Sequence, residues 1–352
     1  MIILTEGNLL KSDAEALVNT VNTVGVMGKG IALQFKKAFP ENYELYAKAC
    51  KKDKVVPGTM FVTKSTDLID PKYIINFPTK KHWRGKSKIE YVEEGLNDLI
   101  KVVQDKHIKS IAIPPLGCGL GGLSWETVRL LIEGAFASLP DVDVFLYPPK
   151  GTPCAKSMPN RTAKPKMTPG RRSLLGVLSH YASMRFDPEF TLIETQKLCY
   201  FLQLAGQPLR LNFVKWFYGP YATNLKHVIN SLDGHYLTGW GAGDERPLVK
   251  LQLVNSMQSK INDGLKKDQE LSDRIERVLD LVEGFDSPYG LELLGTVHWV
   301  ITQELECKVD PEKIFGSISN WTDRKSRMFQ RSHIDLAIER LESKGWLQDC
   351  PI

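Results

Sequence analysis

Residues 16–32 read ALVNTVNTVGVMGKGIA and join an apolar run, a glycine-rich turn and the start of a helix. The apolar run at 16–19 predicts a strand, and residues 31–38 have the spacing of a helix that Pro40 stops. Glycines in the turn let backbone N–H groups point inward, and the following helix adds the positive end of its dipole. The stretch therefore predicts a strand, a turn and a helix that together cradle an anion.

A second glycine-rich turn lies at residues 114–124, PPLGCGLGGLS, after an expected strand at 110–113 and before a helix capped by Ser124. Neither turn matches the dinucleotide fingerprint GxGxxG or the nucleoside-triphosphate loop that ends in GKS or GKT. Either turn alone would more often be only a tight connection. Two such turns at neighbouring strand ends suit a diphosphate, so together they favour an ADP-containing ligand.

Strand-like and helix-like segments alternate through residues 1–150, which predicts an α/β domain with a mostly parallel central sheet flanked by helices. Residues 151–170 hold four prolines and two glycines, so they are expected to be a linker. Residues 171–352 show helical periodicity and predict a mainly α-helical second domain. The expected strands are 2–5, 16–19, 60–63, 73–77, 110–113, 142–147, 213–217 and 249–253, and the expected helices are 31–38, 91–103, 124–138, 173–184, 191–205, 221–232, 271–282, 291–303 and 334–344.

The composition is that of an ordinary globular protein, with 352 residues, 42% hydrophobic, 25% charged and a net charge of +5. No segment is basic enough for tight duplex DNA binding by charge alone. The sequence has no apolar run long enough to span a membrane and no secretory signal, so we expect a cytoplasmic protein. Its six cysteines lack the spacing of a zinc site, and we expect neither a metal nor a cofactor.

Four ordered motifs within residues 1–150 resemble those of macrodomains, the ADP-ribose-binding α/β modules. The motifs are Thr5-Glu-Gly-Asn8-Leu9, Ala16-Leu-Val-Asn19 leading to Asn22, Met27-Gly-Lys-Gly-Ile-Ala32 and Leu116-Gly-Cys-Gly119-Leu120. A further stretch, Asn76-Phe-Pro-Thr79-Lys80-Lys-His-Trp-Arg84, is similar to the DarG branch, the antitoxins of DarTG toxin–antitoxin systems. The fused helical second domain also fits that branch.

The resemblance implies an antitoxin that is also an enzyme. DarG-type proteins remove the ADP-ribose that their partner toxin, the ADP-ribosyltransferase DarT, attaches to thymine bases of single-stranded DNA. We therefore expect a DNA ADP-ribosyl glycohydrolase whose partners are ADP-ribose, ADP-ribosylated single-stranded DNA and DarT. Residues 1–150 would bind and hydrolyse, and residues 171–352 would bind and inhibit the toxin. A hydrolase of ADP-ribosylated protein or of O-acetyl-ADP-ribose, and a non-catalytic ADP-ribose reader, remain alternatives.

The same resemblance assigns roles to the residues of a ligand site. Asn8 and Leu9 occupy the adenine position, and Asn22 occupies the position beside the distal ribose. The residues that would line the diphosphate are Gly28, Lys29, Gly30, Ile31, Ala32, Gly117, Cys118, Gly119, Leu120 and Gly121. Relatives that hydrolyse ADP-ribosyl-glutamate carry an aspartate in the place of Gly121, so a lysine–aspartate pair is missing from this sequence.

Lys80 stands where the DarG branch has its catalytic lysine. An ammonium beside the leaving pyrimidine would stabilise its negative charge and deliver a proton, which is the role we favour. A neutral amine that attacks the sugar is the other possibility, and it requires a lowered pKa. The neighbouring His82, Trp83 and Arg84 combine basic and aromatic side chains, which suits contact with the backbone and an exposed base of DNA.

Two motifs of the second domain, Gln196-Lys-Leu-Cys-Tyr-Phe201 and Trp216-Phe-Tyr-Gly-Pro-Tyr221, faintly resemble the helical antitoxin domains of the SocA-like group. The aromatic side chains of the second motif are expected to pack in the core rather than to form a binding face. The segment 334–346 is a candidate for the start of a winged-helix hairpin, but its acidic residues argue against DNA reading.

Overall fold

The computed structural model describes residues 1–65, 71–149, 153, 157–243, 245–254, 261, 263–265 and 267–348. The chain divides into two compact units, which are Met1–Ala163 with Gly241–Asp244, and Lys164–Trp240 with Glu245–Ile352. The first unit includes part of the expected linker, since the Arg161 N–H donates a hydrogen bond to the Lys37 carbonyl at 2.8 Å. No helix in the described part of the chain is long and apolar enough to cross a membrane.

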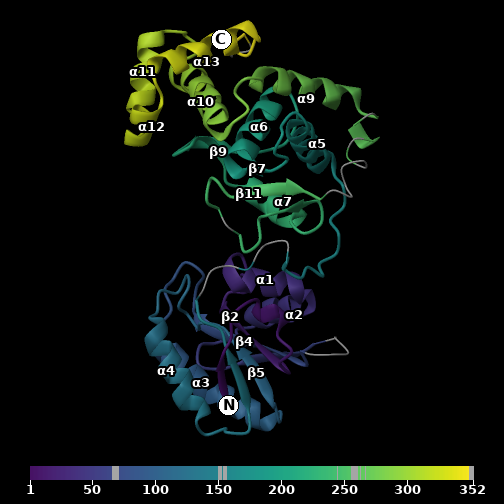
Figure 1. The fold of residues 1–352 in the computed structure, drawn as a ribbon, viewed down its shortest axis with the longest axis vertical. Helices are drawn as coiled ribbons and strands as arrows, with labels where there is room; N and C mark the ends of the chain where they lie inside the picture. Colours follow the sequence, from purple (N-terminus) through teal and green to yellow (C-terminus); the bar gives the residue numbers. More distant parts are fainter. Residues whose placement is uncertain are drawn as a thin grey trace. The chain divides into compact units, whose positions relative to one another are not determined.

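A six-stranded sheet forms the centre of the first unit (Figure 1). Its spatial order is β1-β6-β5-β2-β4-β3, and every neighbouring pair is parallel except β3 and β4. Strands β5, β2 and β4 are neighbours, so their carboxyl ends meet at one edge, where open α/β sheets bind ligands. The strands are β1 (Ile2–Leu4), β2 (Ala16–Asn22), β3 (Phe61–Lys64), β4 (Tyr73–Lys80), β5 (Ser110–Ile113) and β6 (Asp143–Leu146).

Helices cover both faces of this sheet. Leu96 of α3 and Val128 of α4 share a hydrophobic cluster with Val18 of β2. Leu17, the preceding residue of β2, points to the opposite face and clusters with Phe35 of α1. The helical segments are η1 (Leu9–Lys11), α1 (Gly30–Ala38), α2 (Pro40–Cys50), α3 (Ile89–Asp105) and α4 (Trp125–Phe136).

Two segments of the first unit differ from the sequence-based expectation. Pro40 follows the end of α1 but also begins a second helix, α2, because a proline in the first turn loses no intrahelical hydrogen bond. The strand expected at 73–77 continues to Lys80. Pro78 is tolerated there because β3 pairs with β4 only as far as Asn76, so no ladder bond is lost on that side.

The second unit is mainly helical around one hydrophobic cluster, so the expected fold class is confirmed. Gly219–Ala222 form a strand, and the helix expected from Tyr221 therefore begins at Leu225. The winged-helix hairpin expected after 334–346 falls mostly outside the described residues. The elements are α5 (Pro169–Ser183), β7 (Phe190–Thr191), α6 (Leu192–Leu204), β8 (Phe213–Trp216), β9 (Gly219–Ala222), α7 (Leu225–Leu232), β10 (Leu237–Thr238), β11 (Lys250–Leu253), α9 (Gln269–Val282), α10 (Pro288–Trp299), η3 (Val300–Glu304), α11 (Pro311–Ser319), α12 (Asp323–Met328) and α13 (Arg331–Ser343).

Candidate functional site

Lys80 is the last residue of β4, and its side chain reaches the second glycine-rich turn. Its Nζ donates hydrogen bonds to the carbonyl oxygens of Leu120 at 3.0 Å and Gly85 at 3.3 Å. Partial burial lowers the pKa of Lys80, whereas the two carbonyl oxygens favour the charged ammonium. The amine is thus held between the loop that follows β4 and the turn that follows β5.

The second glycine-rich turn packs closely on itself and on Ser87. Gly117 has a φ of +70°, in the left-handed region that favours glycine. A β-carbon at Gly121 would overlap the Gly117 carbonyl oxygen and the Ser87 hydroxyl, so a side chain has no room there. The Ser87 N–H also donates to the Gly121 carbonyl at 3.1 Å. An aspartate in place of Gly121 would therefore not fit this turn without a rearrangement of its backbone.

The first glycine-rich turn is organised by Asn22, at the end of β2. The Asn22 Oδ1 accepts hydrogen bonds from the N–H groups of Val24 at 3.0 Å and Val26 at 3.3 Å, and its Nδ2 donates to the Val26 carbonyl at 2.6 Å. The Asn22 side chain is buried. In this structure its carboxamide folds the turn, and the contact with the distal ribose stays a prediction.

The two glycine-rich turns approach each other across Leu120. Gly30 begins α1 with a φ of +62°, and a β-carbon on it would lie 3.9 Å from Leu120 Cδ1. The Leu120 side chain is 72% exposed and lies at the first turn. The structure therefore brings together the two segments expected to line a diphosphate, namely Gly28, Lys29, Gly30, Ile31 and Ala32 with Gly117, Cys118, Gly119, Leu120 and Gly121.

Asn8 and Leu9 lie at the start of η1, which packs near α1. Asn8 caps this short helix, because its Oδ1 accepts a hydrogen bond from the Leu10 N–H at 3.1 Å. The Asn8 Nδ2 is buried without a hydrogen-bond partner in the described structure. Leu9 is buried in the same cluster as Phe35 of α1. Asn8 is half-buried and Leu9 is buried, and their contact with adenine stays a prediction.

Residues 81–86 form an exposed loop that carries the residues expected to contact DNA. The Trp83 ring is 47% exposed, the His82 ring centroid lies 5.3 Å from it, and the Arg84 guanidinium lies 4.6 Å from its centre. The Thr23 N–H and hydroxyl both donate to the Lys81 carbonyl, at 3.2 and 2.8 Å. The loop is therefore anchored to the first glycine-rich turn while its aromatic side chains remain accessible.

Cys118 lies within the second glycine-rich turn but is not a ready nucleophile. Burial and the nearby Glu126 carboxylate raise the pKa of Cys118 to about 11, so it is a thiol at neutral pH. Its Sγ donates to the Leu116 carbonyl at 3.4 Å. Among the described residues, no group of His, Cys, Asp and Glu is placed to hold a metal.

Sequence reasoning missed two residues that shape this site. The Tyr46 hydroxyl of α2 donates to the Asn22 carbonyl at 2.6 Å, and burial raises the Tyr46 pKa, which keeps it a donor. Ser87 closes the second turn, and its buried hydroxyl has no hydrogen-bond partner in the described structure. Neither residue belongs to a motif, and only packing in three dimensions identifies them.

The fold and its paired glycine-rich turns define a macrodomain, and the family model described as "Macro domain" matches residues 18–132. Relatives named "DNA ADP-ribosyl glycohydrolase" are similar over nearly the whole chain. The Thermus aquaticus protein is 44% identical over 350 residues, 99% of this chain and 95% of the relative. The Mycobacterium tuberculosis protein is 42% identical over 353 residues, 97% of this chain and 99% of the relative. The chain belongs to the DNA ADP-ribosyl glycohydrolase family, which places it among the macrodomain hydrolases.

Among solved structures, the chain is similar to the "Macrodomain of Mycobacterium tuberculosis DarG". It is 57% identical with a TM-score of 0.42, and the match covers 43% of this chain and 99% of that one. A Thermosipho africanus relative is named a "DNA ADP-ribosyl transferase-DNA ADP-ribosyl glycohydrolase fusion protein". It is 35% identical over 178 residues, 46% of this chain and 45% of the relative.

Gly121→Ala should push the second turn away from Ser87 and weaken ADP-ribose binding about tenfold or more, because overpacking a close contact costs on the order of 1–3 kcal/mol. Titration calorimetry with ADP-ribose measures this. The matched control is Gly134→Ala in α4, where a β-carbon would meet nothing within 4 Å. The control should bind ADP-ribose like the unchanged protein. Equal affinities for the two variants would contradict the packing argument.

Proposed function

We propose that the protein removes ADP-ribose from thymine bases of single-stranded DNA. The observation that carries this proposal is the position of Lys80, whose amine lies between the second glycine-rich turn and the base of the exposed loop 81–86. A ligand whose diphosphate rests on the glycine-rich turns would place its distal sugar at this edge of the sheet. The relatives named DNA ADP-ribosyl glycohydrolase support the same substrate class.

ADP-ribose would lie along the carboxyl edge of the sheet. The backbone amides of residues 28–32 and 117–121 would hold the diphosphate, assisted by the N-terminal dipole of α1. The adenine would meet Asn8, whose buried amide nitrogen lacks a hydrogen-bond partner in the described structure, and the neighbouring Leu9. The distal ribose would lie near Asn22 and Lys80, which are aligned where β2 pairs with β4.

The exposed loop would hold the modified strand. Bases of single-stranded DNA stack on exposed aromatic rings, and basic side chains follow the phosphates. Trp83 offers an accessible ring, and His82 and Arg84 lie against it. A base bearing ADP-ribose must stand out of any stack to reach the site, and a stacking platform beside the catalytic lysine would hold its neighbours.

Lys80 would act as an acid and an electrostatic stabiliser. In this step the bond between C1″ and the base nitrogen breaks, and a water oxygen forms the new bond to C1″. The ammonium gives a proton to the departing base and regains one from the attacking water. The two carbonyl oxygens around Nζ support this role, because they stabilise the charged form rather than the neutral amine that a nucleophile requires.

The packing around Gly121 counts against the second candidate, a hydrolase of ADP-ribosylated acidic side chains. The resemblance implies that enzymes of that kind carry an aspartate at the position of Gly121. The turn in this chain has no room for an aspartate side chain there. A non-catalytic reader of ADP-ribose would bind the ligand without turnover. Assays on ADP-ribosylated DNA, ADP-ribosylated protein and O-acetyl-ADP-ribose, run side by side, separate the three functions.

The second unit would bind and inhibit a DarT-type ADP-ribosyltransferase toxin. A protein that joins a transferase and a glycohydrolase in one chain exists in Thermosipho africanus, which supports a functional link between the two activities. Neutralisation would then have two routes, reversal of the DNA modification by the first unit and restraint of the toxin by the second.

Lys80→Ala should lower the release of ADP-ribose from thymine-modified single-stranded DNA by about 100-fold or more, the usual contribution of a positioned acid. Release is measured chromatographically, and calorimetry with free ADP-ribose tests whether the binding site remains intact. We expect binding to change little. Unchanged turnover in this variant would refute the catalytic role of Lys80.

The pH dependence of turnover distinguishes the two roles of Lys80. Burial lowers its pKa, so the ammonium is lost at a lower pH than for an ordinary lysine. If the ammonium acts, the initial rate should be constant near neutral pH and fall as the pH rises through this lowered pKa. The Lys80→Ala variant is the control, and its residual rate should not show this fall at higher pH. A rate that rises over the same interval would identify the neutral amine as a nucleophile.

Trp83→Ala should weaken binding of single-stranded DNA by about tenfold, because stacking of one base contributes on the order of 1–3 kcal/mol. Fluorescence anisotropy with a labelled oligonucleotide measures the loss. Affinity for free ADP-ribose should stay unchanged, since the ring lies on the exposed loop rather than in the glycine-rich turns. A variant that loses ADP-ribose affinity instead would place Trp83 in the nucleotide pocket.

A further inference from the structure

The two motifs singled out in the second half of the sequence meet in the second unit. The Gln196 Nε2 donates to the Ala222 carbonyl at 3.2 Å, and the Ala222 N–H donates to the Gln196 Oε1 at 2.9 Å. The Lys197 Nζ donates to the Pro220 carbonyl at 2.8 Å. A β-carbon on Gly219 would lie 2.8 Å from the Thr296 hydroxyl. The β8–β9 hairpin is therefore fixed on α6 and α10.

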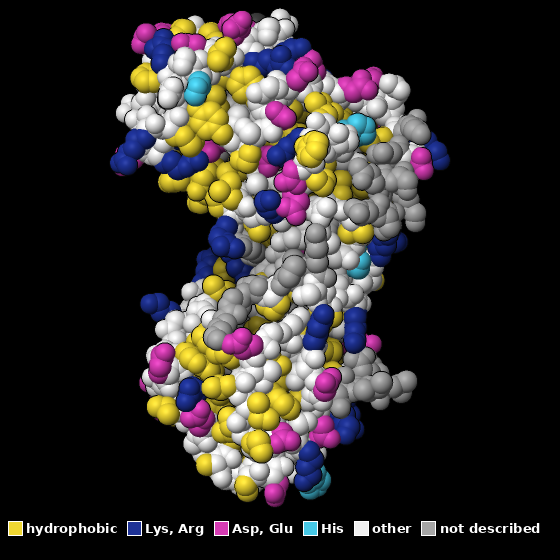
Figure 2. Space-filling view, viewed as in Figure 1, with side chains coloured by type: hydrophobic (Ala, Val, Ile, Leu, Met, Phe, Trp, Pro, Cys, Tyr) yellow, Lys and Arg dark blue, Asp and Glu magenta, His cyan; other side chains and the backbone are white. Residues whose placement is uncertain are grey.

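The hairpin exposes the aromatic side chains that the sequence analysis expected in the core. Trp216 is 56% exposed, Phe217 is 45% exposed and Val214 is 47% exposed. The core expectation is wrong for Trp216 and Phe217, because the helical side chains hold the backbone of β9 and leave β8 and the turn after it on the surface. Figure 2 shows hydrophobic side chains gathered on this side of the second unit, where Figure 1 places β9.

A cavity of about 190 Å³ opens beside this hairpin. Lys197 lies among its lining residues, with Trp216, Tyr218 and Tyr221 contributed by the hairpin. The volume suits one amino-acid side chain rather than a nucleotide. The aromatic groups supply apolar contact, and the fully buried lysine supplies an amine that donates hydrogen bonds.

Among the described residues around this cavity, basic side chains outnumber acidic ones, although Glu245 also lines it and pairs with Lys226 at 3.6 Å. Lys197, Arg324 and Lys325 are gathered around a single buried carboxylate, Glu292. The two terminal nitrogens of Arg324 donate hydrogen bonds to the Glu292 carboxylate at 2.7 and 3.0 Å, and the Lys325 Nζ donates to it at 2.6 Å. Lys197 instead donates to the carbonyl of Pro220. Burial and the neighbouring Lys325 lower the pKa of Lys197 to about 7, and the Glu292 carboxylate, which acts in the opposite direction, offsets this only in part.

We infer that this cavity receives an aspartate or glutamate side chain of the partner transferase, whose adjacent residues pack on Trp216 and Phe217. A carboxylate next to Lys197 would supply the missing negative charge in a desolvated setting, where ion pairing is strongest. Exposed tryptophan around a buried charged pair is the usual composition of a binding hot spot. The inference rests on the proposed toxin-binding role of the second unit.

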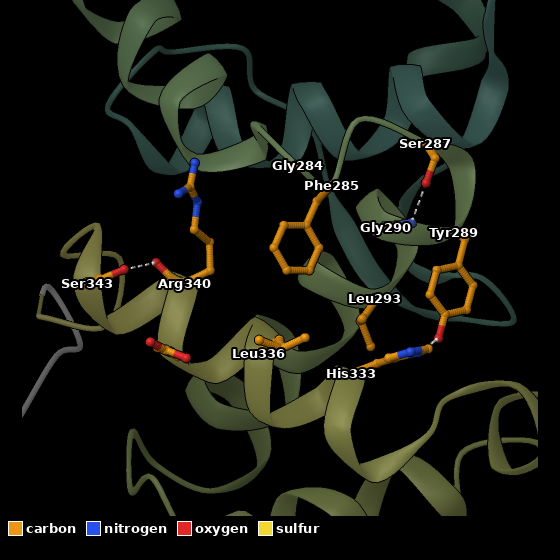
Figure 3. Close-up of a pocket in the computed structure, with 11 residues that line it drawn as sticks. Gly284, Phe285, Ser287, Tyr289, Gly290, Leu293, His333, Leu336, Arg340 and Ser343 are labelled. Carbon is orange, nitrogen blue, oxygen red and sulfur yellow. Dashed lines mark hydrogen bonds between the residues drawn. The ribbon is translucent and has the colours of Figure 1, made fainter.

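A second, larger cavity in the described part of this unit has no buried lysine among its lining residues. It measures about 450 Å³ and lies between the segment at Phe285 and α13, with Leu293 and Leu336 at its centre (Figure 3). The Tyr289 hydroxyl is hydrogen-bonded to His333 Nδ1 at 2.6 Å, and the Arg340 Nε donates to a backbone carbonyl. The Tyr289, His333 and Arg340 side chains are thus bonded within the protein. The larger cavity therefore serves as a control surface rather than as a second candidate.

The test titrates the full chain against its DarT-type transferase by calorimetry. Lys197→Met keeps the length of the side chain and removes its charge, and we expect a loss of affinity of about 30-fold or more, typical when one partner of a buried charged pair is removed. Trp216→Ala, a surface change, should cost about tenfold. The matched control is Leu336→Ala, 55% exposed at the other cavity, which should bind within about twofold of the unchanged chain.

The outcomes separate this inference from the proposed function. Tight binding by the unchanged chain and by both hairpin variants would overturn the inference and leave toxin binding intact. No binding by the unchanged chain would overturn both. In the supporting case, an alanine scan finds one acidic residue of the transferase whose replacement weakens binding to the unchanged chain. The same replacement does not weaken binding to the Lys197→Met variant any further. The helical circular dichroism signal and the thermal unfolding of each full-length variant verify that the second unit, which carries the substitutions, is folded.

Discussion

The parallel pairing of β2 with β4 is the constraint on which the site depends. It aligns residues from Ala16 opposite Tyr73 to Asn22 opposite Lys80, so the glycine-rich turn and the lysine emerge at one edge. Two buried amides lie within this pairing, where the Asn19 Nδ2 donates to the Asn76 Oδ1 at 3.1 Å. A one-residue slip would separate these amides and turn every side chain of the strand to the other face.

The sequence predicted the parts of the site that local chemistry specifies. The two glycine-rich turns were visible because left-handed backbone at Gly30 and Gly117 requires glycine. The resemblance singled out Lys80, although the strand that carries it was expected to end earlier. Ser87 and Tyr46 were not predictable, because each acts on a segment distant in sequence through packing alone. No periodicity or spacing reports such contacts.

The second unit shows the opposite limit of sequence reasoning. Hydrophobic side chains such as Trp216 and Phe217 indicate burial, but the sequence does not show which other element would cover them. Here Gln196 bonds to both backbone groups of Ala222 as another strand would, so the hairpin is held by a helix instead of being covered. Its aromatic side chains then remain exposed. Burial of a strand thus depends on which element satisfies its backbone.

The absence of space at Gly121 limits what a single substitution can change. A single mutation to aspartate cannot convert this turn into the acid-bearing type, because the new side chain would meet both a hydroxyl and a main-chain oxygen. Shortening Ser87 would remove only the first obstacle, and the turn at Gly117 would also have to shift. The two kinds of turn therefore differ in their packing as well as in one side chain, and a change at residue 121 alone does not interconvert them.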